Sequence, residues 1–524
     1  MKLPNILGRF GRRAQASEPM TPPKPERPRR SFLARSLSQL FKSGQPLQND
    51  TWTSTPVTPD AWISLHHPAL VARSREQWSN NDYVRAFIRL VRQNIVGPQG
   101  IVMQAKAQKP RGDLDKDLNE ALECDWEKWG EQGNCDVTGK LSWRAALCLL
   151  TETTARDGEF IIRLCYGKEA GPMGFAIQLI DPQRLSVRYE NAKIDNQGGF
   201  IRHSIEFNRY GRPVAYHFAS TDEWDAYYYS YAGRGFVRIP AEEIIHGFVH
   251  EQVSQRRGLP WASTSLFRLH NLQGFEDAAV QNARASAAKM GFIEWQEGFG
   301  PEADDDVDVA STIDAEPLSF HELPEGAKLA EWAPNYPSGE FATFHKAMLR
   351  GAAAGMGVLY NNMAGDLEGV NFSSIRQGTL DEREHWKELQ QWLIQAACKP
   401  VRAAYLKYRL LAGEIRYSNG KPVPATKLPE CMKCEWQPRR WAWIDPRADV
   451  DANIAQMRAG LVAPSAIIRE SGRDPEAVFI QFAHDLEAMK AAGITDDILH
   501  LFLFGEMKPP KPAAPDAGAE GKPS

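Results

Sequence analysis

One stretch of the chain, residues 262–290, has a hydrophobic pattern that only a long helix explains. Its apolar side chains recur every three or four residues for about eight turns of 3.6 residues each. At 1.5 Å per residue, this helix is roughly 40 Å long. Because its apolar face shrinks from Leu and Phe to Ala, and small residues let helices approach closely, we expect it in a tight assembly rather than alone. The apolar positions are Leu266, Leu269, Leu272, Phe275, Ala279, Ala283 and Ala287.

The segments after this helix alternate between β-like and helical patterns. Residues 291–334 predict a β-like insertion with an acidic loop, and residues 338–356 predict another helix. Residues 360–371 are rich in Asn and Gly, which is typical of a loop. A second long helix is predicted over residues 373–411, with a kink at Pro400. Its inward positions are Ile375, Trp386, Leu389, Leu393 and Ala397.

The part before the first long helix, residues 51–255, predicts an α+β region with one mixed sheet. Residues 210–213 are typical of a hairpin turn, and residues 156–159 predict a tight turn from helix to strand. Residues 445–505 predict a small helical region near the other end. In the first region, helices are predicted over residues 79–96, 114–129 and 142–156, and strands over residues 100–108, 159–165, 175–180, 201–208, 214–219 and 244–249.

The charge of the chain is divided unevenly. The 524 residues carry a formal net charge of −4, which argues against a protein that coats nucleic acid by bulk charge. Residues 1–42 hold ten Lys and Arg but only Glu18 and Glu26, which gives +8 and leaves −12 for the remaining 482 residues. The basic, proline-containing residues 1–50 and the proline-rich residues 506–524 are predicted to be disordered tails.

Several classes of protein are excluded by simpler features. No apolar run approaches the roughly 18 residues that span a bilayer, and the N-terminus lacks the apolar core of a secretory signal. The seven cysteines are scattered, which indicates a reducing, cytoplasmic site of synthesis rather than a disulfide framework.

The motifs that carry chemistry are incomplete. The sequence closest to a phosphate-binding loop, around Gly139-Lys140-Leu141, has the wrong glycine spacing and Leu where a hydroxyl is needed. Cys431 and Cys434 have no second ligand pair for zinc, so ordinary thiols are favoured. Residues 255–260 predict the start of a helix, although contact with phosphate is an alternative. The aromatic residues 224–231 fit base stacking or packing against a neighbouring subunit. We therefore expect no catalytic residue, cofactor or metal, and no enzyme.

The order of several short motifs resembles that of the lambda family of bacteriophage portal proteins. No single motif is specific, but their order follows the family over about residues 60–490. Asp366 also lies where that family's pattern expects it, and Phe372 replaces the usual tyrosine. The matching motifs are Asn94-Ile95-Val96-Gly97 with Gly100-Ile101, Asp157-Gly158-Glu159, Ile239-Pro240-Ala241 with Ile244-Ile245-His246, Gln255-Arg256-Arg257-Gly258-Leu259-Pro260, Leu323-Pro324-Glu325-Gly326, and Asn371-Phe372-Ser373-Ser374-Ile375-Arg376.

The resemblance implies a ring of about twelve subunits around a DNA channel at one capsid vertex. The implied fold is a portal fold with an α/β wing, long stem helices, a β-rich clip, a tunnel loop and a helical crown. The implied division is a basic tail (1–50), wing (51–260), first stem helix (261–290), clip (291–337), second stem helix (338–357), tunnel loop (358–372), long kinked helix with the rest of the wing (373–444), crown (445–505) and C-terminal tail (506–524).

The resemblance also implies partners. These are other copies of the chain, double-stranded DNA bound without sequence specificity, the terminase large subunit, the major capsid or scaffold protein, and a head–tail connector, with no membrane. The location implied is the portal vertex of the virion, after assembly in the cytoplasm of the host bacterium. The basic tail is either an assembly contact to scaffold, shell or DNA, or a solubilising arm. Alternative interpretations are a terminase-like nuclease or ATPase, or another head–tail connector protein.

Candidate site residues follow from this assignment. Basic and amide side chains of the stem and tunnel loop are candidates to face DNA, and acidic side chains of the clip are candidates to dock terminase. Inter-subunit salt bridges with Glu276 or Asp277 are an equal alternative for the basic residues. The DNA-channel candidates are Arg284, Lys289, Lys346, Arg350, Asn361, Asn362 and Asn371, and the clip candidates are Asp304, Asp305, Asp306 and Asp308.

Overall fold

The computed structural model describes residues 56–110, 112–194, 198–220, 235–287, 291–295, 327–331, 341–441, 446–471, 473 and 475–494. Residues Pro59–Ser524 cluster as one unit, distinct from Met1–Thr58. The acidic loop with Asp304, Asp305, Asp306 and Asp308 lies outside the described residues, as do Lys289, residues 224–231 and both predicted tails. None of the described helices is long and apolar enough to cross a membrane.

The first described elements are two consecutive helices, α2 (Pro59–Asn80) and α3 (Asp82–Ile95). The predicted helix over residues 79–96 therefore starts later, because Asn81 caps α3. Its side-chain oxygen accepts hydrogen bonds from the backbone N–H groups of Tyr83 and Val84, and such a cap satisfies donors that the first helical turn leaves unpaired. The pattern did not predict α2, whose buried face includes the polar side chains of His67, Ser74 and Gln77.

The next two helices and the first long strand follow the prediction closely. They are α4 (Lys116–Gly130), α5 (Trp143–Asp157) and β2 (Glu159–Tyr166). Ser142 caps α5 by accepting a hydrogen bond from the backbone N–H of Ala145. Gly158 ends the helix at φ 96°, a left-handed conformation that favours glycine. The predicted turn from helix to strand at residues 156–159 is confirmed.

The described strands form separate antiparallel sheets, so the prediction of one mixed sheet is wrong. A three-stranded sheet has the order β3-β2-β8, a four-stranded sheet has the order β4-β5-β6-β7, and β1 pairs with β11. The bounds are β1 (Val102–Ala105), β3 (Phe175–Ile180), β4 (Phe200–Arg202), β5 (Ile205–Phe207), β6 (Pro213–Ala219), β7 (Phe236–Pro240), β8 (Ile244–Phe248) and β11 (Cys434–Gln437).

One turn explains part of this difference. The predicted strand over residues 201–208 is two strands, β4 and β5, that reverse at His203 and Ser204. Both residues have positive φ, 53° and 65°, which is uncommon for residues other than glycine and is the geometry of a tight hairpin turn. The hairpin predicted at residues 210–213 is confirmed and joins β5 to β6.

Strand β2 lies between two hydrophobic cores. Phe160, Ile162 and Leu164 face the larger core, and Ile161 faces a smaller core that it shares with the four-stranded sheet. Because successive side chains of a strand point to opposite faces, one strand serves both cores. Residues on both sides of β2 are therefore fixed by packing.

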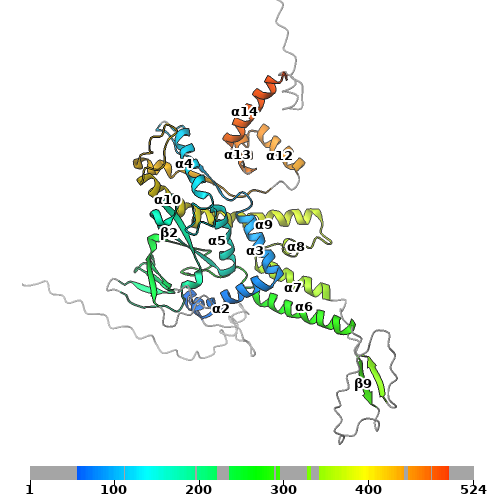
Figure 1. Ribbon diagram of the computed structural model, residues 1–524. Helices are drawn as coiled ribbons and strands as arrows, with labels where there is room; N and C mark the ends of the chain where they lie inside the picture. The colour runs from blue at the N-terminus through cyan, green and yellow to red at the C-terminus, as the bar shows by residue number, and fades with distance from the viewer. Residues whose placement is uncertain are drawn as a thin grey trace, which may run out of the picture. The chain divides into compact units, whose positions relative to one another are not determined.

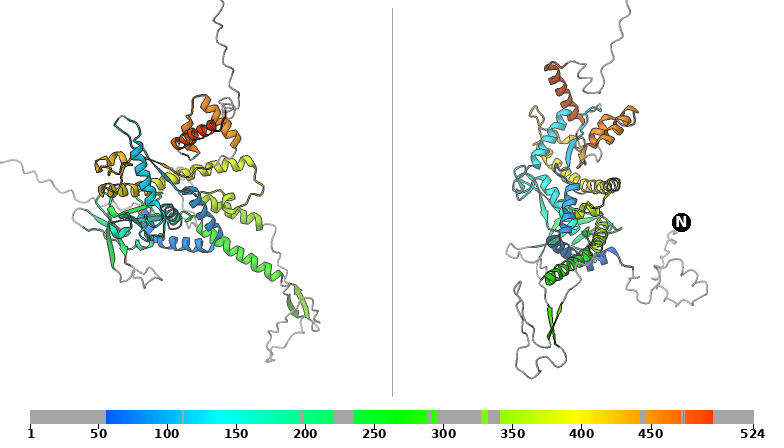
Figure 2. Two further views of the ribbon diagram at one scale, coloured as in Figure 1. Left: turned by 45° about the horizontal axis from the view of Figure 1, so that its top comes forward. Right: turned by 90° about the vertical axis from the view of Figure 1, so that its right-hand side faces the viewer.

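Two antiparallel-packed long helices follow, α6 (Leu266–Ala287) and α7 (Phe341–Gly355), and they lie side by side (Figures 1 and 2). Helix α6 begins at Leu266 rather than at residue 262, after turns that follow Pro260. The Ser265 hydroxyl donates a hydrogen bond to the backbone oxygen of Ala352 at 2.9 Å and ties the two helices together. Between them in sequence, β9 (Gly291–Trp295) pairs with β10 (Ala327–Glu331), which agrees with the predicted β-like insertion.

The second long helix is interrupted by a π-helical segment just before Pro400. It consists of α9 (Phe372–Leu393), a π-helical segment η5 (Ile394–Cys398) and α10 (Lys399–Leu411). Pro400 has no N–H to donate to the carbonyl four residues earlier, and the wider π turn just before it accommodates this gap. The irregularity predicted at Pro400 thus lies in the preceding turn.

Short helices complete the described structure. Helix α8 (Tyr360–Ala364) occupies the first part of the segment that the sequence predicts to be a loop, and α11 (Leu428–Cys431) precedes β11. The predicted helical region near the C-terminus contains α12 (Pro446–Arg458), α13 (Pro464–Glu470) and α14 (Pro475–Ala491).

Candidate functional site

Five of the six described DNA-channel candidates lie on α7, on α8 and at the start of α9. Lys346 and Arg350 lie one turn apart on α7, and both cations lie over the ring of Tyr360, at 5.7 and 5.6 Å from its centre. The Lys346 Nζ also forms an ion pair with Asp366 Oδ2 at 2.6 Å. These two basic side chains are therefore held by residues of the segment that follows them.

Asp366 is the centre of this arrangement, which we call the Asp366 clamp (Lys346, Tyr360, Asn361 and Asp366). The Tyr360 hydroxyl donates a hydrogen bond to Asp366 Oδ2 at 2.7 Å. Hydrogen bonds from Lys346 and then Tyr360 hold the pKa of Asp366 well below its usual value. Burial and the bond to Asp366 raise the pKa of Tyr360 to about 12. The carboxylate is thus charged at any ordinary pH and keeps the loop closed on α7.

The three candidate asparagines hold the same segment. The amide of Asn361 donates to the backbone oxygen of Asp366 at 2.6 Å. The amide of Asn362 donates to the carboxylate of Glu382 on α9, which also accepts the N–H of Leu359 at 3.3 Å. Asn371 caps α9 by accepting the N–H of Ser373. In a single chain, these amides bond to protein atoms.

Replacing Asp366 by alanine should loosen residues 359–371. The substitution removes the acceptor shared by Lys346 and Tyr360, so we expect several-fold faster backbone hydrogen exchange in this segment. Asp277→Ala is the matched control, because Asp277 is an exposed aspartate on α6. Unchanged protection in the Asp366 variant would show that packing, not the clamp, orders the segment.

The remaining stem candidates differ in their surroundings. Arg284 is exposed near the end of α6. Glu276, one of the acidic residues considered for inter-subunit pairing, instead lies against His345 Nε2 within the chain, and His345 also contacts the Tyr83 hydroxyl at 3.4 Å. Asp277 is exposed. The contact of Glu276 with His345 therefore ties α6 to α7.

A buried ionic centre lies at the start of β2, and sequence reasoning did not find it. Glu159 is fully buried and accepts hydrogen bonds from Arg257, from His246 Nε2 at 3.0 Å and from the N–H of Gly258 at 3.0 Å. Arg257 Nη1 also donates to the backbone oxygen of Leu185 at 2.7 Å. The centre joins two motifs, residues 157–159 and residues 255–260, whose sequences predict only a turn and a helix start. Because the two motifs are about a hundred residues apart, no local pattern in the sequence indicates that they meet.

Two glycines allow this centre to form. A Cβ atom at Gly158 would collide with the backbone of Leu259, and one at Gly258 would collide with the carbonyl oxygen of Gly158. The two backbone segments are therefore in direct contact, and neither can carry a side chain at that point. This contact is the physical reason for a glycine in each motif.

His67 of α2 lies at the edge of the centre, with its Nε2 atom 4.0 Å from Glu159 Oε1. Burial, followed by the charge of Arg257, lowers the pKa of His67 to about 4. The unfolded chain takes up this proton near pH 6.5. Between pH 6.5 and pH 4, the unfolded state binds more protons at this position than the folded state does. The contribution of His67 to stability is therefore fully present above pH 6.5 and is lost as the pH falls toward 4.

The chain should therefore lose stability on acidification by up to about 1.4 kcal/mol per pH unit from His67 alone. A His67→Gln variant cannot titrate at this position and should lose less between about pH 7 and about pH 5. Urea unfolding of both chains at the two pH values measures the difference. His203, whose pKa burial also lowers, is present in both chains, and the difference between the chains includes its charge interaction with His67. Equal losses in the two chains would contradict the assignment to His67.

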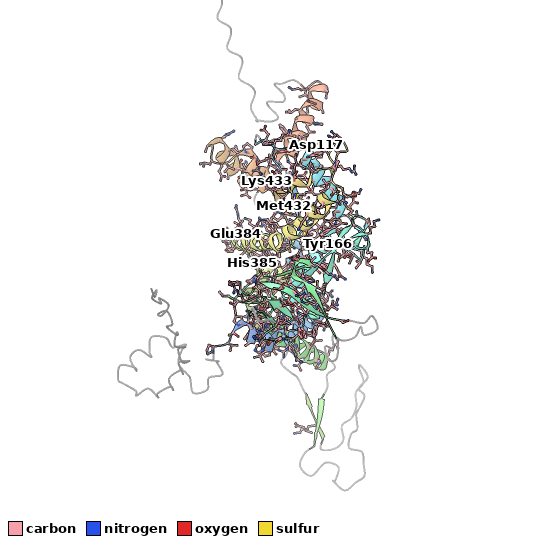
Figure 3. All side chains as sticks on the ribbon, turned by 90° about the vertical axis from the view of Figure 1, so that its left-hand side faces the viewer. Asp117, Tyr166, Glu384, His385, Met432 and Lys433 are labelled. Atoms are coloured by element: carbon pink, nitrogen blue, oxygen red, sulfur yellow. The ribbon has the colours of Figure 1, made fainter. Side chains whose placement is uncertain are left out.

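Cys431 ends α11, and Cys434 begins β11. Cys431 and Cys434 are free thiols, and burial raises the pKa of both. Met432 and Lys433 between them are exposed (Figure 3). Within the described ranges, no cluster of three or more His, Cys, Asp or Glu side chains has the geometry to hold a metal ion.

Comparisons with known proteins give consistent results. The chain matches the family model described as "Phage portal protein, lambda family" over residues 45–390. The "Probable portal protein" of Halomonas phage phiHAP-1 is 33% identical over 488 residues, which cover 92% of this chain and 91% of that protein. The "Portal protein" of Escherichia phage N15 is 19% identical over 491 residues, which cover 84% and 88% of the two chains.

Among solved structures, the chain is similar to proteins of gene transfer agent (GTA) particles. One is from "Neck of empty GTA particle computed with C6 symmetry", at 13% identity and a TM-score of 0.40, covering 78% of this chain and 94% of that chain. Another is from "Neck of native GTA particle computed with C12 symmetry", at 13% identity and a TM-score of 0.38, covering 85% and 100%.

Proposed function

The chain belongs to the lambda family of phage portal proteins, and from this membership we propose that about twelve copies form a ring at one capsid vertex. Double-stranded DNA passes through the ring during packaging and ejection. The ring is a component of the virion and is assembled in the cytoplasm of the host bacterium. The protein is a structural part of the packaging machine rather than its enzyme, and a separate terminase supplies the ATPase.

We assign the parts of the proposed ring to the described elements. Helices α6 and α7 are the stem, β9 and β10 belong to the clip, and the segment from α8 to Asn371 is the tunnel loop. The sheets with α2 to α5 and α9 to α10 form the wing, and α12 to α14 form the crown. The clip docks terminase through its acidic loop, Asp304, Asp305, Asp306 and Asp308, and the ring also contacts the capsid or scaffold protein and a head–tail connector. The basic tail, residues 1–50, is an assembly contact or a solubilising arm.

The observation that carries the ring is a pair of exposed apolar side chains on α6. Phe267 and Val280 are 77% and 52% exposed in the single chain, and thirteen residues at about 100° each place them on different sides of a helix that also packs on α7. Large apolar side chains left exposed on one helix mark a surface that a partner covers. A neighbouring copy of the same stem supplies that cover in a ring.

The charges near the tunnel loop fit a channel that contacts DNA weakly. Lys346 and Arg350 lie against Tyr360, and Lys346 pairs with Asp366, so their attraction for phosphate is reduced. Phosphate contacts give affinity without sequence reading, and strong ones would slow a sliding duplex. Arg284, Lys289, Lys346, Arg350, Asn361, Asn362 and Asn371 remain our candidates for facing the channel.

Imaging of the purified chain tests the proposal. Negative-stain images should show rings with an axial hole, and a uniform monomer that hydrolyses ATP or DNA with magnesium would overturn it. Val280→Glu should abolish the rings while leaving the fold intact, because it places a charge on the stem surface. Val237→Glu is the matched control, since Val237 is 48% exposed on β7. Rings of unchanged yield in the Val280 variant would move the interface away from α6.

A further inference from the structure

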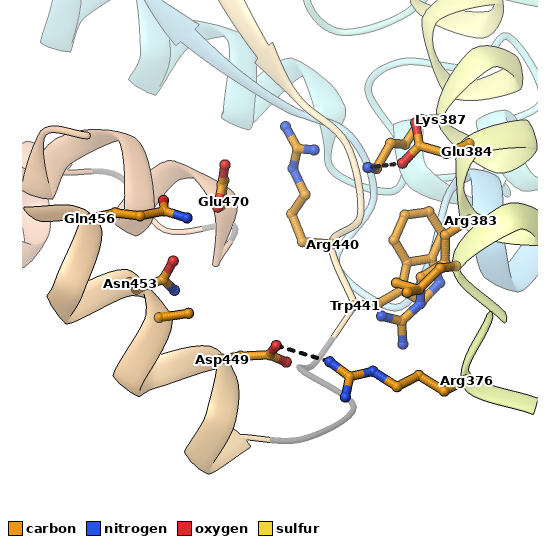
Figure 4. Close-up of a pocket in the computed structure, with 12 residues that line it drawn as sticks. Arg376, Arg383, Glu384, Lys387, Arg440, Trp441, Asp449, Asn453, Gln456 and Glu470 are labelled. Carbon is orange, nitrogen blue, oxygen red and sulfur yellow. Dashed lines mark hydrogen bonds and ion pairs between the residues drawn. The ribbon is translucent and has the colours of Figure 1, made fainter. Parts of the chain in front are cut away.

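Three clefts join into one groove at residues 438–441, away from the tunnel loop. The first, about 850 Å³, lies between α3 and α5, and the second, about 290 Å³, adjoins it through Pro98 and Arg439, which line both. The third, about 480 Å³, lies between α9 and α12 and shares Arg440 with the second (Figure 4). Because they share lining residues, the three clefts adjoin one another, and we call them together the arginine groove.

The groove is strongly cationic in a chain whose residues after 42 carry a net charge of −12. Three of its carboxylates pair with cations of the groove: Glu152 with Arg92, Glu384 with Lys387, and Asp449 with Arg376. One further carboxylate, that of Glu470, lines the third cleft. Six of the lining residues are arginines, namely Arg92, Arg144, Arg376, Arg383, Arg439 and Arg440.

Three of these arginines differ from the others in their partners. No described carboxylate forms an ion pair with Arg144, Arg439 or Arg440. Arg144 donates to the backbone oxygen of Gly97 at 3.2 Å, and Arg439 donates to the backbone oxygen of Gln93 and to Asn94 Oδ1. These acceptors are neutral, so they fix the guanidinium groups without neutralising them.

Several contacts hold the side chains at the centre of the groove. The Trp441 indole donates a hydrogen bond to Asn94 Oδ1 at 2.8 Å. Arg383 and Arg439 lie 5.7 and 5.9 Å from the centre of its ring. A Cβ atom at Gly97 would lie 2.8 Å from the Arg439 side chain, so the chain passes close to it. Two like charges are thus held beside one aromatic ring by the fold.

We propose that the arginine groove binds the phosphodiester backbone of double-stranded DNA. Guanidinium groups match the geometry of phosphate oxygens, and a row of fixed cations suits a ligand whose negative charges repeat along a line. Such contacts are independent of base sequence and weaken with salt, because binding releases counterions. The groove shares no residue with the channel candidates, so it is a second DNA contact, beyond the proposed function of the ring.

The test uses the full-length chain and fluorescent duplexes of about 30 base pairs in two unrelated sequences, titrated over a range of NaCl concentrations. The double variant Arg144→Gln/Arg440→Gln removes two exposed, unpaired cations. We expect the slope of log K against log salt to become shallower by about 2 for both sequences, because each arginine that is removed leaves one phosphate without its cation. The control Arg209→Gln/Arg212→Gln removes the same charge from exposed residues at the β5–β6 turn and should leave the slope unchanged.

Two results would overturn the proposal. One is a slope in the groove variant that equals the slope in the chain with the intact groove, or no DNA binding by either chain. The other is an equal change of slope in the control, which would mean that only net charge matters. Negative-stain images of the same samples separate this question from ring formation. If the groove variant lost its rings but kept its DNA slope, the groove would bind an acidic surface of a neighbouring copy instead.

Discussion

Replacing Arg257 by methionine should lower the free energy of unfolding by about 3–5 kcal/mol. The change would leave the Glu159 carboxylate buried without its main partner, and both side chains are almost fully enclosed, at 1% and 0% exposure. Burial alone would raise the pKa of Glu159, but the charge of Arg257 and the bond from His246 hold it well below its usual value. The carboxylate is therefore charged in the folded chain and depends on Arg257.

Arg238→Met is the matched control for this experiment. Arg238 makes the same kind of paired contact with Glu206, at 2.8 Å, but its side chain is 49% exposed, and such pairs contribute about 0–1 kcal/mol. Chemical denaturation of both variants measures the contrast. The double variant Arg257→Met/Glu159→Leu should recover much of the stability, because it removes the stranded charge as well. A similar cost for Arg257→Met and Arg238→Met would refute the role of burial.

Trp129→Ala should cost about 3–5 kcal/mol, as large aromatic truncations in cores do. Trp129 of α4 is fully buried, and its indole donates a hydrogen bond to the backbone oxygen of Phe175 at 2.9 Å. Its ring lies 5.5 Å from Trp143 of α5 and 5.2 Å from Tyr405 of α10. One side chain therefore joins three helices and a strand, and its removal opens a cavity where they meet.

Trp62→Ala provides the comparison, because Trp62 on α2 is 39% exposed. Its removal should cost less than about 1 kcal/mol. Trp129→Phe should fall between the two, since it keeps much of the apolar area and loses the hydrogen bond. Thermal unfolding followed by near-ultraviolet circular dichroism reports on this core directly. If Trp129→Ala, Trp129→Phe and Trp62→Ala all unfolded at the same temperature, Trp129 would not be the junction that its contacts indicate.

The sequence predicted correctly those elements whose ends are set by neighbouring residues. Ser142 and Gly158 fix both ends of α5, and the apolar run that follows fixes β2, so that unit was predicted nearly to the residue. Helix α2 was missed because polar residues such as Ser74 and Gln77 fill its buried face, which erases the hydrophobic period. The reversal at His203 and Ser204 was missed because the segment has no glycine or Asn-Gly pair, which is the usual sequence signal of such a turn.

In the candidate site, too, the sequence predicted features that depend on neighbouring residues and missed contacts between distant ones. The sequence indicated that Lys346 and Arg350 share a helical face, because their spacing is one turn. It did not indicate that Asp366 would pair with Lys346, since that contact depends on how α8 folds back. The pairing of Glu159 with Arg257 spans 98 residues and depends on the whole three-stranded sheet. Charge pairing between distant segments leaves no periodic trace in a sequence.

The contact between Gly158 and Gly258 has a consequence for synthesis. Strand β2 is made early, but its β8 neighbour and the arginine that neutralises Glu159 emerge about ninety to a hundred residues later, at about 5–20 residues per second. During that interval of several seconds, β2 has one unpaired edge and a carboxylate that has no partner and stays hydrated. Strand β8 ends at Phe248, and Arg257 and Gly258 follow within ten residues, directly before α6. The order of translation thus makes all three strands of this sheet and both members of the buried ion pair before α6, whereas α9 and α10, which complete the larger core, come after it.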